Sequence, residues 1–360
     1  MMSSIKDVAS AAGVSISTVS NVINNTKYVS PKLQEKVNAA VALLNYEADS
    51  QARNLKTGIT ETIGIITADI CGLFYPYVIK GIYETANNKN FSVMIFDAGV
   101  VGDHGSCYER EMECFKRLVM NKVDGIIFAS SIEEDLADGF ISNIVEMCSR
   151  RKQIPLVSIE RDFSNLGIDS VFVDNVRGAR QAVQHLLDVG CTKVCHIMGP
   201  EKAKVVQDRV QGYIKTMEEN GYVVDKHRMI EKGDYTHQSG YLALKRLLES
   251  APDLDGVFIS NDQMAIGALK ALQECKKRVP EDVRVVGFDN VFVSSIVEPS
   301  LSTIHIRKNH MGRNAADILF SRIEKNEPPS DIVKEELESR LVIRKSTMKD
   351  AAEDWILSEW

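Results

Sequence analysis

The sequence lacks the features that mark secreted or membrane-spanning proteins. Its seven cysteines are odd in number and scattered, and none forms a C-x-x-C pair, which indicates a reducing compartment rather than a disulfide framework. No basic and then apolar leader opens the sequence, and no apolar run approaches the roughly twenty residues that span a bilayer. We therefore expect a cytoplasmic protein with no membrane segment.

Motifs of catalysis and of cofactor binding are also missing. The sequence contains no G-x-x-x-x-G-K-S/T, G-x-G-x-x-G, H-E-x-x-H or G-x-S-x-G. Cys191 and Cys195 lack the second ligand pair that a zinc site needs, and His196 lies within a predicted strand, where a core histidine is expected. We expect no enzyme activity, no cofactor and no metal.

An overall positive charge, common in proteins that bind nucleic acid along their whole length, is absent too. The formal net charge is −7 over 360 residues, yet residues 1–60 carry +2 and the others −9. A positive charge confined to residues 1–60 is expected if only the N-terminal part approaches phosphates. The length itself predicts two or three folding units with large cores.

The stretch Ile5–Asn24 has the pattern of two short helices joined by a tight turn. Ser4 can cap the first helix, Gly13 supplies a left-handed residue that ends it, and Ser15 can cap the second helix. A short, polar, uncharged outer face fits the major groove of DNA. An ordinary capped helix pair remains the alternative, because helix-turn-helix geometry has no unique sequence code. The outer face of the second helix comprises Ile16, Ser17, Thr18, Ser20 and Asn21.

A third helix follows, with Ser30 as its cap and Pro31 at its first position. The three helices predict an all-α headpiece over residues 1–46, and residues 47–60 form a polar hinge. The inward-facing residues are expected to be Ile5, Val8, Ala9 and Ala12 in the first helix, Val19, Val22 and Ile23 in the second, and Leu33, Val37, Ala40, Val41 and Leu44 in the third.

From Thr62 onward, short apolar strands alternate with amphipathic helices. This alternation predicts doubly wound parallel sheets covered by helices on both faces, and about ten strands divide near residue 160 into two α/β lobes. Ligands bind such sheets beyond the carboxyl ends of the strands, where Glu160, Arg161 and Asp174 lie. Strands are predicted at 62–67, 91–96, 125–129, 155–159, 170–173, 193–197, 228–231, 256–259 and 283–288.

Longer motifs run through nearly the whole chain. They are I-K-D-V-A-x-x-A-G-V-S-x-S-T-V-S at 5–20, V-S-P at 29–31, A-R-N-L at 52–55, T-I-G-I-I at 62–66, V-D-G-I-I at 123–127, G-D-Y-T-H-Q-S-G-Y at 233–241, S-N-D-Q-M-A-I-G-A at 260–268 and V-P-E-D-V-R-V-V-G-F-D-N at 279–290. With these motifs the chain resembles bacterial transcription regulators of the lactose and galactose repressor (LacI/GalR) family. The resemblance implies a DNA-binding headpiece, a hinge, and a two-lobed core similar to type I periplasmic sugar-binding proteins, which dimerises and binds a small effector between its lobes.

The resemblance also implies three crossings of the chain between the lobes. We expect them near Glu160, near Asp289 and between Lys308 and Glu327. The N-lobe would then hold residues 61–160 and 291–320, and the C-lobe residues 161–289 and 321–345. A tail at 346–360 contains Trp355 and Trp360, and it either packs on the core or forms an exposed end.

The resemblance places the DNA contacts in the second helix and the hinge. Ile16 and Ser17 match residues that contact operator bases, and Thr18 and Ser20 match residues that contact phosphates. Leu55 matches a leucine that wedges into the minor groove. Where many relatives have arginine this chain has Asn21, so the preferred bases are expected to differ. The set is completed by Ser4, Ser15, Asn24, Tyr28, Ala52, Arg53 and Lys56.

The effector contacts follow from the same resemblance. Arg209 matches an arginine that holds effector hydroxyls or carboxylates, and Asn261 and Asp289 match groups that hydrogen-bond the same ligand. Phe74 and Tyr235 match aromatic side chains that lie against it. With Glu160, Arg161 and Asp174, these residues suit a sugar or a similar polyhydroxylated molecule.

Local explanations remain open for three of these residues. Arg209 can pair with Asp208 or Glu201, Asp289 can cap the turn after its strand, and Tyr235 can pack on the surface.

The sequence thus predicts a DNA-binding transcription regulator, a repressor that binds a palindromic operator as a homodimer under the control of a sugar-like effector. The alternative is a soluble solute-binding α/β protein whose N-terminal helices have no DNA-binding role.

Overall fold

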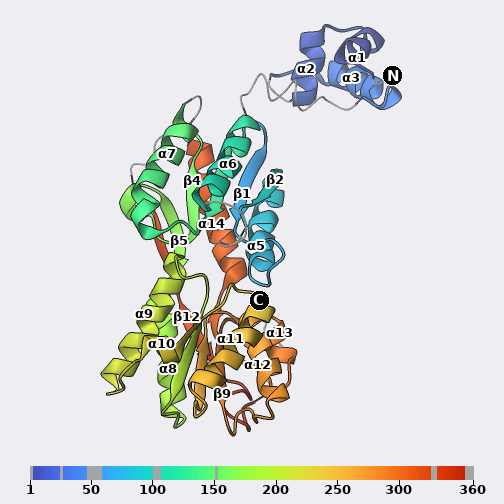
Figure 1. Cartoon of the computed structure of the whole chain (residues 1–360). Coiled ribbons are helices and arrows are strands. Elements are labelled where there is room, and N and C mark those ends of the chain that lie inside the picture. The colour runs from blue at the N-terminus through green and yellow to red at the C-terminus, as the bar shows by residue number, and fades with distance from the viewer. Residues whose placement is uncertain are drawn as a thin grey trace. The chain divides into compact units, whose positions relative to one another are not determined.

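The computed structural model describes residues 3–24, 27–46, 59–99, 107–150, 153–325 and 331–352. The chain forms two compact units, residues 1–60 and residues 61–360 (Figure 1). Within the described ranges, no helix is long and apolar enough to cross a membrane, and no group of three or more His, Cys, Asp or Glu side chains could hold a metal ion.

The first unit is a bundle of three short helices. α1 (Ile5–Ala12) ends at Gly13, whose φ of 64° is left-handed, and α2 (Ile16–Asn24) begins after the turn. The Ser15 hydroxyl accepts a 3.1 Å hydrogen bond from the Thr18 amide. Ser15 therefore caps α2 as predicted, since it satisfies a backbone donor that the helix leaves unpaired.

The core of this bundle lies where α3 (Pro31–Leu43) meets the other two helices. Val8, Val19 and Val37 have no exposed surface. Leu33, predicted to face inward, is 36% exposed. That prediction is wrong because Leu33 lies in the first turn of α3, ahead of the positions that the other helices cover.

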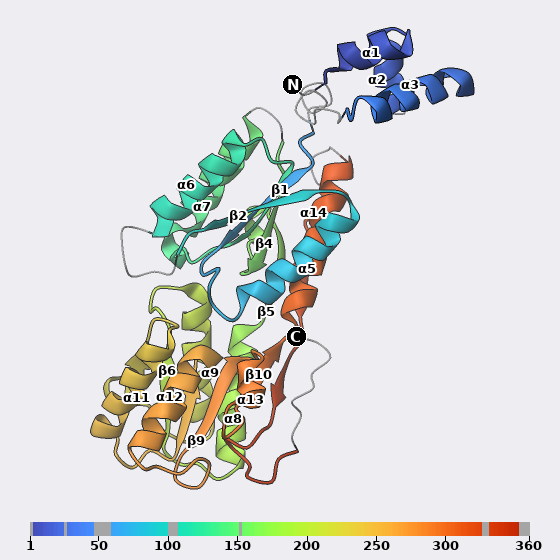
Figure 2. The same ribbon diagram turned by 90° about the vertical axis from the view of Figure 1, so that its right-hand side faces the viewer.

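The second unit contains two six-stranded sheets, each at the centre of a lobe (Figures 1 and 2). All pairs in the N-lobe sheet are parallel. Its strands, in spatial order, are β11 (Lys334–Leu337), β5 (Asp169–Val173), β4 (Leu156–Glu160), β3 (Gly125–Ala129), β1 (Thr62–Thr67) and β2 (Ser92–Asp97). One face packs on α5 (Tyr75–Asn88) and α14 (Lys308–Lys325), the other on α6 (Cys107–Met120) and α7 (Ala137–Ser149).

The C-lobe sheet is parallel except for one edge, where β12 runs antiparallel to β10. Its strands, in spatial order, are β12 (Ser339–Val342), β10 (Ser302–Ile306), β9 (Arg284–Asp289), β8 (Gly256–Ile259), β6 (Val194–Met198) and β7 (Ile230–Lys232). Helices α8 (Asn175–Asp188) and α9 (Lys204–Glu219) cover one face, and α11 (His237–Ser250) and α12 (Asp262–Glu274) cover the other. Short helices are α10 (Lys226–Met229), α13 (Val293–Ile296), η1 (Glu134–Leu136) and η2 (Ser164–Leu166).

A helical headpiece and two doubly wound parallel-sheet lobes confirm the predicted fold class, but the chain crosses between the lobes at other places than predicted. The first crossing follows β5 and not Glu160, because β5 pairs with β4. The second follows β10 and not Asp289, because β10 pairs with β9. The third lies at Glu338, between β11 and β12, so all of α14 belongs to the N-lobe.

Strand β10 escaped prediction because its polar side chains resemble those of a surface loop. Ser302, Thr303 and His305 are at most 1% exposed, and the Thr303 hydroxyl donates a 2.6 Å hydrogen bond to Asp262. Partners distant in sequence therefore make these polar groups compatible with a buried central position.

The predicted tail also begins too early. Ser346 is fully buried, and its hydroxyl donates a 2.6 Å hydrogen bond to the Val285 carbonyl of β9. The first residues assigned to the tail are therefore part of the C-lobe, while Trp355 and Trp360 lie outside the described residues.

Two glycines allow α11 and α12 to approach closely. A Cβ atom on Gly267 would lie 1.8 Å from the His237 carbonyl oxygen, and one on Gly240 would lie 2.1 Å from the Met264 carbonyl oxygen. Both obstacles are backbone atoms, so a side chain at either position would separate the helices.

Gly267→Ala should accordingly lower the free energy of unfolding by about 2 kcal/mol through overpacking, as urea denaturation would measure. The matched control is Gly139→Ala in α7, where nothing lies within 4 Å of an added Cβ. There the higher helix propensity of alanine should stabilise the chain by up to about 1 kcal/mol. A Gly267→Ala protein as stable as the wild type would contradict the close approach of the helices.

Candidate functional site

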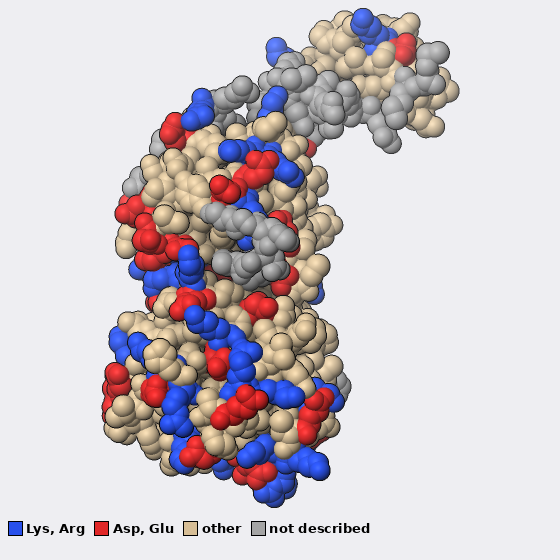
Figure 3. Space-filling model, viewed as in Figure 1, with Lys and Arg blue, Asp and Glu red and all other residues tan. Residues whose placement is uncertain are grey.

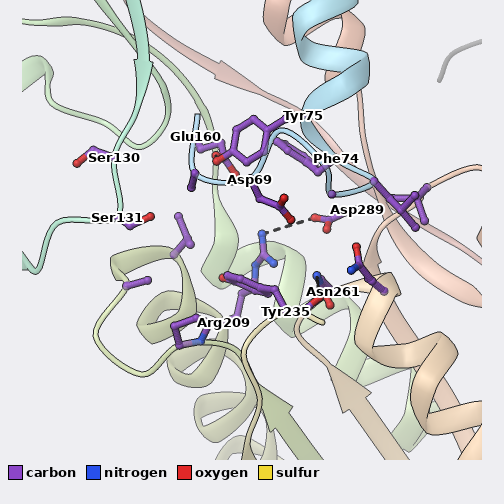
Figure 4. Close-up of a pocket in the computed structure, with 18 residues that line it drawn as sticks. Asp69, Phe74, Tyr75, Ser130, Ser131, Glu160, Arg209, Tyr235, Asn261 and Asp289 are labelled. Carbon is purple, nitrogen blue, oxygen red and sulfur yellow. Dashed lines mark hydrogen bonds and ion pairs between the residues drawn. The ribbon is translucent and has the colours of Figure 1, made fainter. Parts of the chain in front are cut away.

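A pocket lies between the lobes, beyond the carboxyl ends of the central strands of both sheets (Figure 4). The space between its walls is about 870 Å³, a volume that includes the open mouth. Polar and aromatic side chains dominate its walls. The N-lobe contributes Asp69, Phe74, Tyr75, Ser130, Ser131 and Glu160, and the C-lobe contributes Arg209, Tyr235, Asn261, Gln263 and Asp289.

Arg209 is held rigidly at the C-lobe side of the pocket. Its Nε donates a 2.9 Å hydrogen bond to Asn175 Oδ1, and its Nη1 donates to the Ser260 carbonyl. Its Nη2 lies 3.7 Å from Asp289 Oδ1, and the guanidinium stacks on the Phe288 ring at 3.8 Å. The charge is therefore oriented before any ligand arrives, which lowers the entropy lost on binding.

Asp289 ends β9 and is only 6% exposed. Its pKa is raised to about 7, chiefly by burial and further by the carboxyls of Asp262 and Glu160. The Arg209 guanidinium and the Lys308 ammonium lower the pKa of this carboxyl. Lys308 is fully buried beneath it and donates to the carbonyl oxygens of Asp289 at 2.6 Å and of Asn290 at 3.0 Å. Burial therefore favours the protonated carboxyl, whereas the two cations favour the carboxylate.

Asp289→Asn should change how stability depends on pH. In the folded chain the Asp289 carboxyl keeps its proton at pH values above the ordinary pKa of 3.8. In the unfolded chain the same carboxyl has lost its proton at these pH values. The contribution of Asp289 to stability therefore falls as the pH rises from about 4 to about 7. The stability of Asp289→Asn relative to the wild type should rise across this window, as urea titrations at several pH values would measure. A constant difference would contradict a buried carboxyl that retains its proton.

Three residues of the pocket have left-handed backbones although none is glycine. The φ angles are 66° at Glu160, 74° at Tyr235 and 100° at Asp289. Such backbone conformations are unfavourable for residues other than glycine. They are most common at functional sites, where contacts with the surrounding structure stabilise them. Here they occur at three pocket-lining residues, at the ends of strands or in the loops that follow.

Glu160 is joined to a pocket residue that the sequence patterns missed. The Tyr75 hydroxyl donates to Glu160 Oε2, and burial raises the pKa of the Glu160 carboxyl. The Tyr75 ring also meets the Phe74 ring edge-on at 5.3 Å. The sequence signal for Tyr75 was its place beside Phe74 at the start of α5, where both aromatic side chains reach the pocket.

The loop that follows β3 forms a second pocket wall on the N-lobe, and buried side chains fix its position by hydrogen bonds. Glu111, 1% exposed, accepts hydrogen bonds from the Ser130 hydroxyl at 2.7 Å and the Ser131 amide at 2.8 Å. Arg161 donates to the Ile132 carbonyl in the same loop. The sequence did not predict that Glu111 supports the pocket wall. It lies in an ordinary amphipathic helix pattern, and its partners are about twenty residues away.

Two predicted contacts do not line the pocket. Arg161 is directed into the N-lobe, where it pairs with Glu134 and stacks on the Phe163 ring at 4.6 Å. Asp174 caps α8 by accepting a 2.9 Å hydrogen bond from the Arg177 amide. Both predictions are wrong for the same reason: position at a strand end does not determine the direction of a side chain.

The other six predicted residues come together around one space. Phe74, Glu160, Arg209, Tyr235, Asn261 and Asp289 all line the pocket.

The local alternatives for Arg209 do not occur. Asp208 pairs with Lys204, and Glu201 pairs with Lys232. His196 is a fully buried core residue as predicted, with its Nδ1 2.9 Å from the Phe258 carbonyl.

In the headpiece, α2 presents a polar face of small side chains. The Ser15 hydroxyl lies 2.7 Å from that of Ser17 and 2.8 Å from that of Thr18, and Ile16 beside them is 44% exposed. Tyr28 is 89% exposed. Ser20 and Asn21 are partly exposed on the same helix.

Ser4 serves the fold, because its amide and hydroxyl donate to Asp7 at 2.8 and 2.7 Å. The side chain of Asn24 and all of Ala52, Arg53, Leu55 and Lys56 lie outside the described residues, so their DNA contacts stay predictions.

The molecule thus combines a helix pair whose exposed second helix can enter a DNA groove with a two-lobed core whose pocket can hold a small molecule. That combination defines a ligand-responsive DNA-binding regulator.

The chain belongs to the LacI family of bacterial regulatory proteins. Residues 4–49 match the family described as bacterial regulatory proteins, lacI family, and residues 183–347 match the periplasmic binding protein-like domain. The HTH-type transcriptional repressor PurR of Vibrio vulnificus is 32% identical over 349 residues, which cover 97% of this chain and 99% of the relative.

Solved structures agree over the whole fold. The Lac repressor dimer bound to operator and the anti-inducer ONPF has a TM-score of 0.84 at 26% identity, covering 96% of this chain and 99% of that chain. A complex of the transcriptional regulator CelR with cellobiose has a TM-score of 0.68 at 29% identity, with coverages of 96% and 99%. The predicted family and regulatory function are confirmed: the chain is a DNA-binding transcription regulator, not an enzyme.

Proposed function

We propose that this regulator is a repressor that binds a palindromic operator as a homodimer, and that a sugar-like effector in the pocket controls its operator affinity. The observation that carries the proposal is the pocket between the lobes, whose walls join aromatic rings to buried hydrogen-bonding groups. Because its ligand is DNA, the protein would act in the cytoplasm, where a bacterial chromosome lies.

The chemistry of the pocket supports a polyhydroxylated effector. Phe74 and Tyr235 offer ring faces to the C–H faces of a sugar, while Arg209, Asp289 and Asn261 offer donors and acceptors for its hydroxyls. The CelR relative was solved with cellobiose, which is consistent with a carbohydrate here.

Control of DNA affinity would work through the position of the lobes. Effector groups that bind Glu160 on one lobe and Arg209 on the other are satisfied together only at one degree of closure. A ligand that prefers one closure shifts the population towards it. A coupling free energy of about 1–3 kcal/mol between the two sites would be typical.

The headpiece supports operator reading through α2. Its exposed hydroxyls can donate to and accept from base edges in the major groove, and a symmetric dimer would place two such helices on two half-sites. Fluorescence anisotropy with palindromic sequences from the control region of the chain's own operon tests this, with and without sugars that raise the melting temperature. Absence of any salt-sensitive preference for a palindrome would overturn the proposal.

Ser17→Ala should weaken operator binding about tenfold, because one contact to a base or phosphate is worth on the order of 1–3 kcal/mol. The side chain is exposed, so the melting temperature should hardly change. Ser10→Ala, also exposed but on α1, is the control and should retain wild-type affinity. Unchanged operator affinity in Ser17→Ala would remove Ser17 from the DNA contacts.

A further inference from the structure

The pocket holds more carboxyl groups than cations. Asp69, Glu160 and Asp289 line it, and among its described lining residues Arg209 is the one basic side chain. On the outer surface, by contrast, acidic and basic side chains are interspersed over both lobes on the face drawn in Figure 3. The pocket thus carries an excess of carboxyl groups within a core that is itself acidic, with a net charge of −9 outside residues 1–60.

An anionic ligand at Arg209 would meet groups that already surround the guanidinium. Asn175 and the Ser260 carbonyl accept from it, Asp289 faces its remaining side, and the Phe288 ring covers its plane. A phosphate or carboxylate that approached Arg209 would meet Asp289 within a site that excludes most water, where like charges repel strongly.

Among the described residues, neither carboxyl on the N-lobe side forms an ion pair, although the Arg209 charge lowers the pKa of Glu160. Asp69 accepts a 3.1 Å hydrogen bond from the Cys71 amide, and Glu160 accepts from the Tyr75 hydroxyl. Both donors are neutral, and burial raises the pKa of both carboxyls. A cation beside them would offset that burial, as paired charges do in protein interiors.

We infer that the effector carries a protonated amine on its polyhydroxylated frame, held against Asp69 and Glu160, and that the pocket rejects sugar phosphates and sugar acids. This inference rests on the proposed function, because it assigns a charge to the effector of the same pocket. The ammonium group donates charge-assisted hydrogen bonds to the two carboxylates. The ring faces of Phe74 and Tyr235 add a favourable electrostatic environment for a cation.

Calorimetric titration of the intact protein with matched sugars tests the inference. The probes are glucose, glucosamine and glucose 6-phosphate, and the corresponding galactose and mannose sets. In the set whose stereochemistry fits, the amine should bind about tenfold more tightly than the neutral sugar, because charged hydrogen bonds exceed neutral ones by roughly this factor. The phosphates should not bind.

Variants identify the carboxyls responsible. Asp69→Asn combined with Glu160→Gln should abolish the preference for the amine. Glu113→Gln is the control, since this acid lies on α6 with its side chain 53% exposed, and it should keep the preference.

Three results would overturn the inference: a neutral or phosphorylated sugar that binds as tightly as its amine, no binding by any amine sugar, or a preference that survives in the double variant. Operator binding of the same preparation separates this failure from that of the proposed function. A protein that binds a palindromic operator but shows no amine preference refutes only the charge of the effector, whereas one that binds no DNA refutes the repressor.

Discussion

Arg209→Ala should abolish the response to the effector and destabilise the C-lobe. The guanidinium is 4% exposed and lies 3.7 Å from Asp289, so its loss removes one of the two cations that act on this buried carboxyl group and leaves the Lys308 ammonium. Breaking a buried pair from one side costs about 3–5 kcal/mol. Effector affinity should fall by about a hundredfold or more, since two or more hydrogen bonds would be lost. Urea denaturation and calorimetry with the best sugar of the panel would measure both effects.

A double variant, Arg209→Met with Asp289→Asn, separates the two losses. It removes both charges while keeping the volume of the arginine side chain, and neutral replacement of a buried ion pair is often close to neutral for stability. Stability should therefore return to within about 1 kcal/mol of the wild type. The effector response should stay lost and operator affinity unchanged. An Arg209→Ala protein with wild-type effector affinity would mean that Arg209 only supports the fold.

Asp262→Ala should cost about 3 kcal/mol of stability, because it leaves three buried donors unsatisfied. The fully buried carboxyl accepts hydrogen bonds from the Ser294 hydroxyl at 2.6 Å, the Thr303 hydroxyl at 2.6 Å and the Val291 amide at 2.9 Å. Val291 lines the pocket, so effector affinity should fall as well.

The control for Asp262 is another aspartate of the C-lobe whose carboxyl group reaches solvent. Asp253 pairs with Lys193 at the surface with its side chain 60% exposed, and Asp253→Ala should leave the unfolding midpoint nearly unchanged. Asp262→Asn should fall between the wild type and Asp262→Ala, because the amide keeps the shape and one acceptor oxygen. Equal stability of Asp262→Ala and Asp253→Ala would show that the buried hydrogen bonds contribute little.

Most elements of the fold could be predicted from the sequence, but not their assignment to lobes. Strands β1, β3 and β8 lie at the predicted residues, since short apolar runs between turn residues specify them locally. Whether β5 or β10 belongs to one lobe or the other depends on the strand with which it pairs. β5 pairs with β4, and β10 pairs with β9, which it follows after a loop and α13. A pattern along the chain contains no information on that choice.

The pocket shows the same division. Tyr235, Asn261 and Asp289 were found because each lies in a recognisable motif. Arg161 stands next to Glu160, which lines the pocket, yet its side chain turns away from the pocket. The Ser158 hydroxyl donates a 2.8 Å hydrogen bond to the Arg161 carbonyl, and Glu134 accepts from the guanidinium. Its direction follows from these contacts within the N-lobe.

By itself, the sequence determined the helices of the headpiece, the alternation of strands and helices and, through its motifs, several of the residues that line the pocket. These depend on caps, turn residues and hydrophobic periods that act over a few positions. Only the tertiary structure decided where the chain changes lobe, which side chains face the pocket, and that three carboxyl groups share the pocket with Arg209. Such features depend on sheet pairing and side-chain contacts between residues far apart in the chain, which no local pattern encodes.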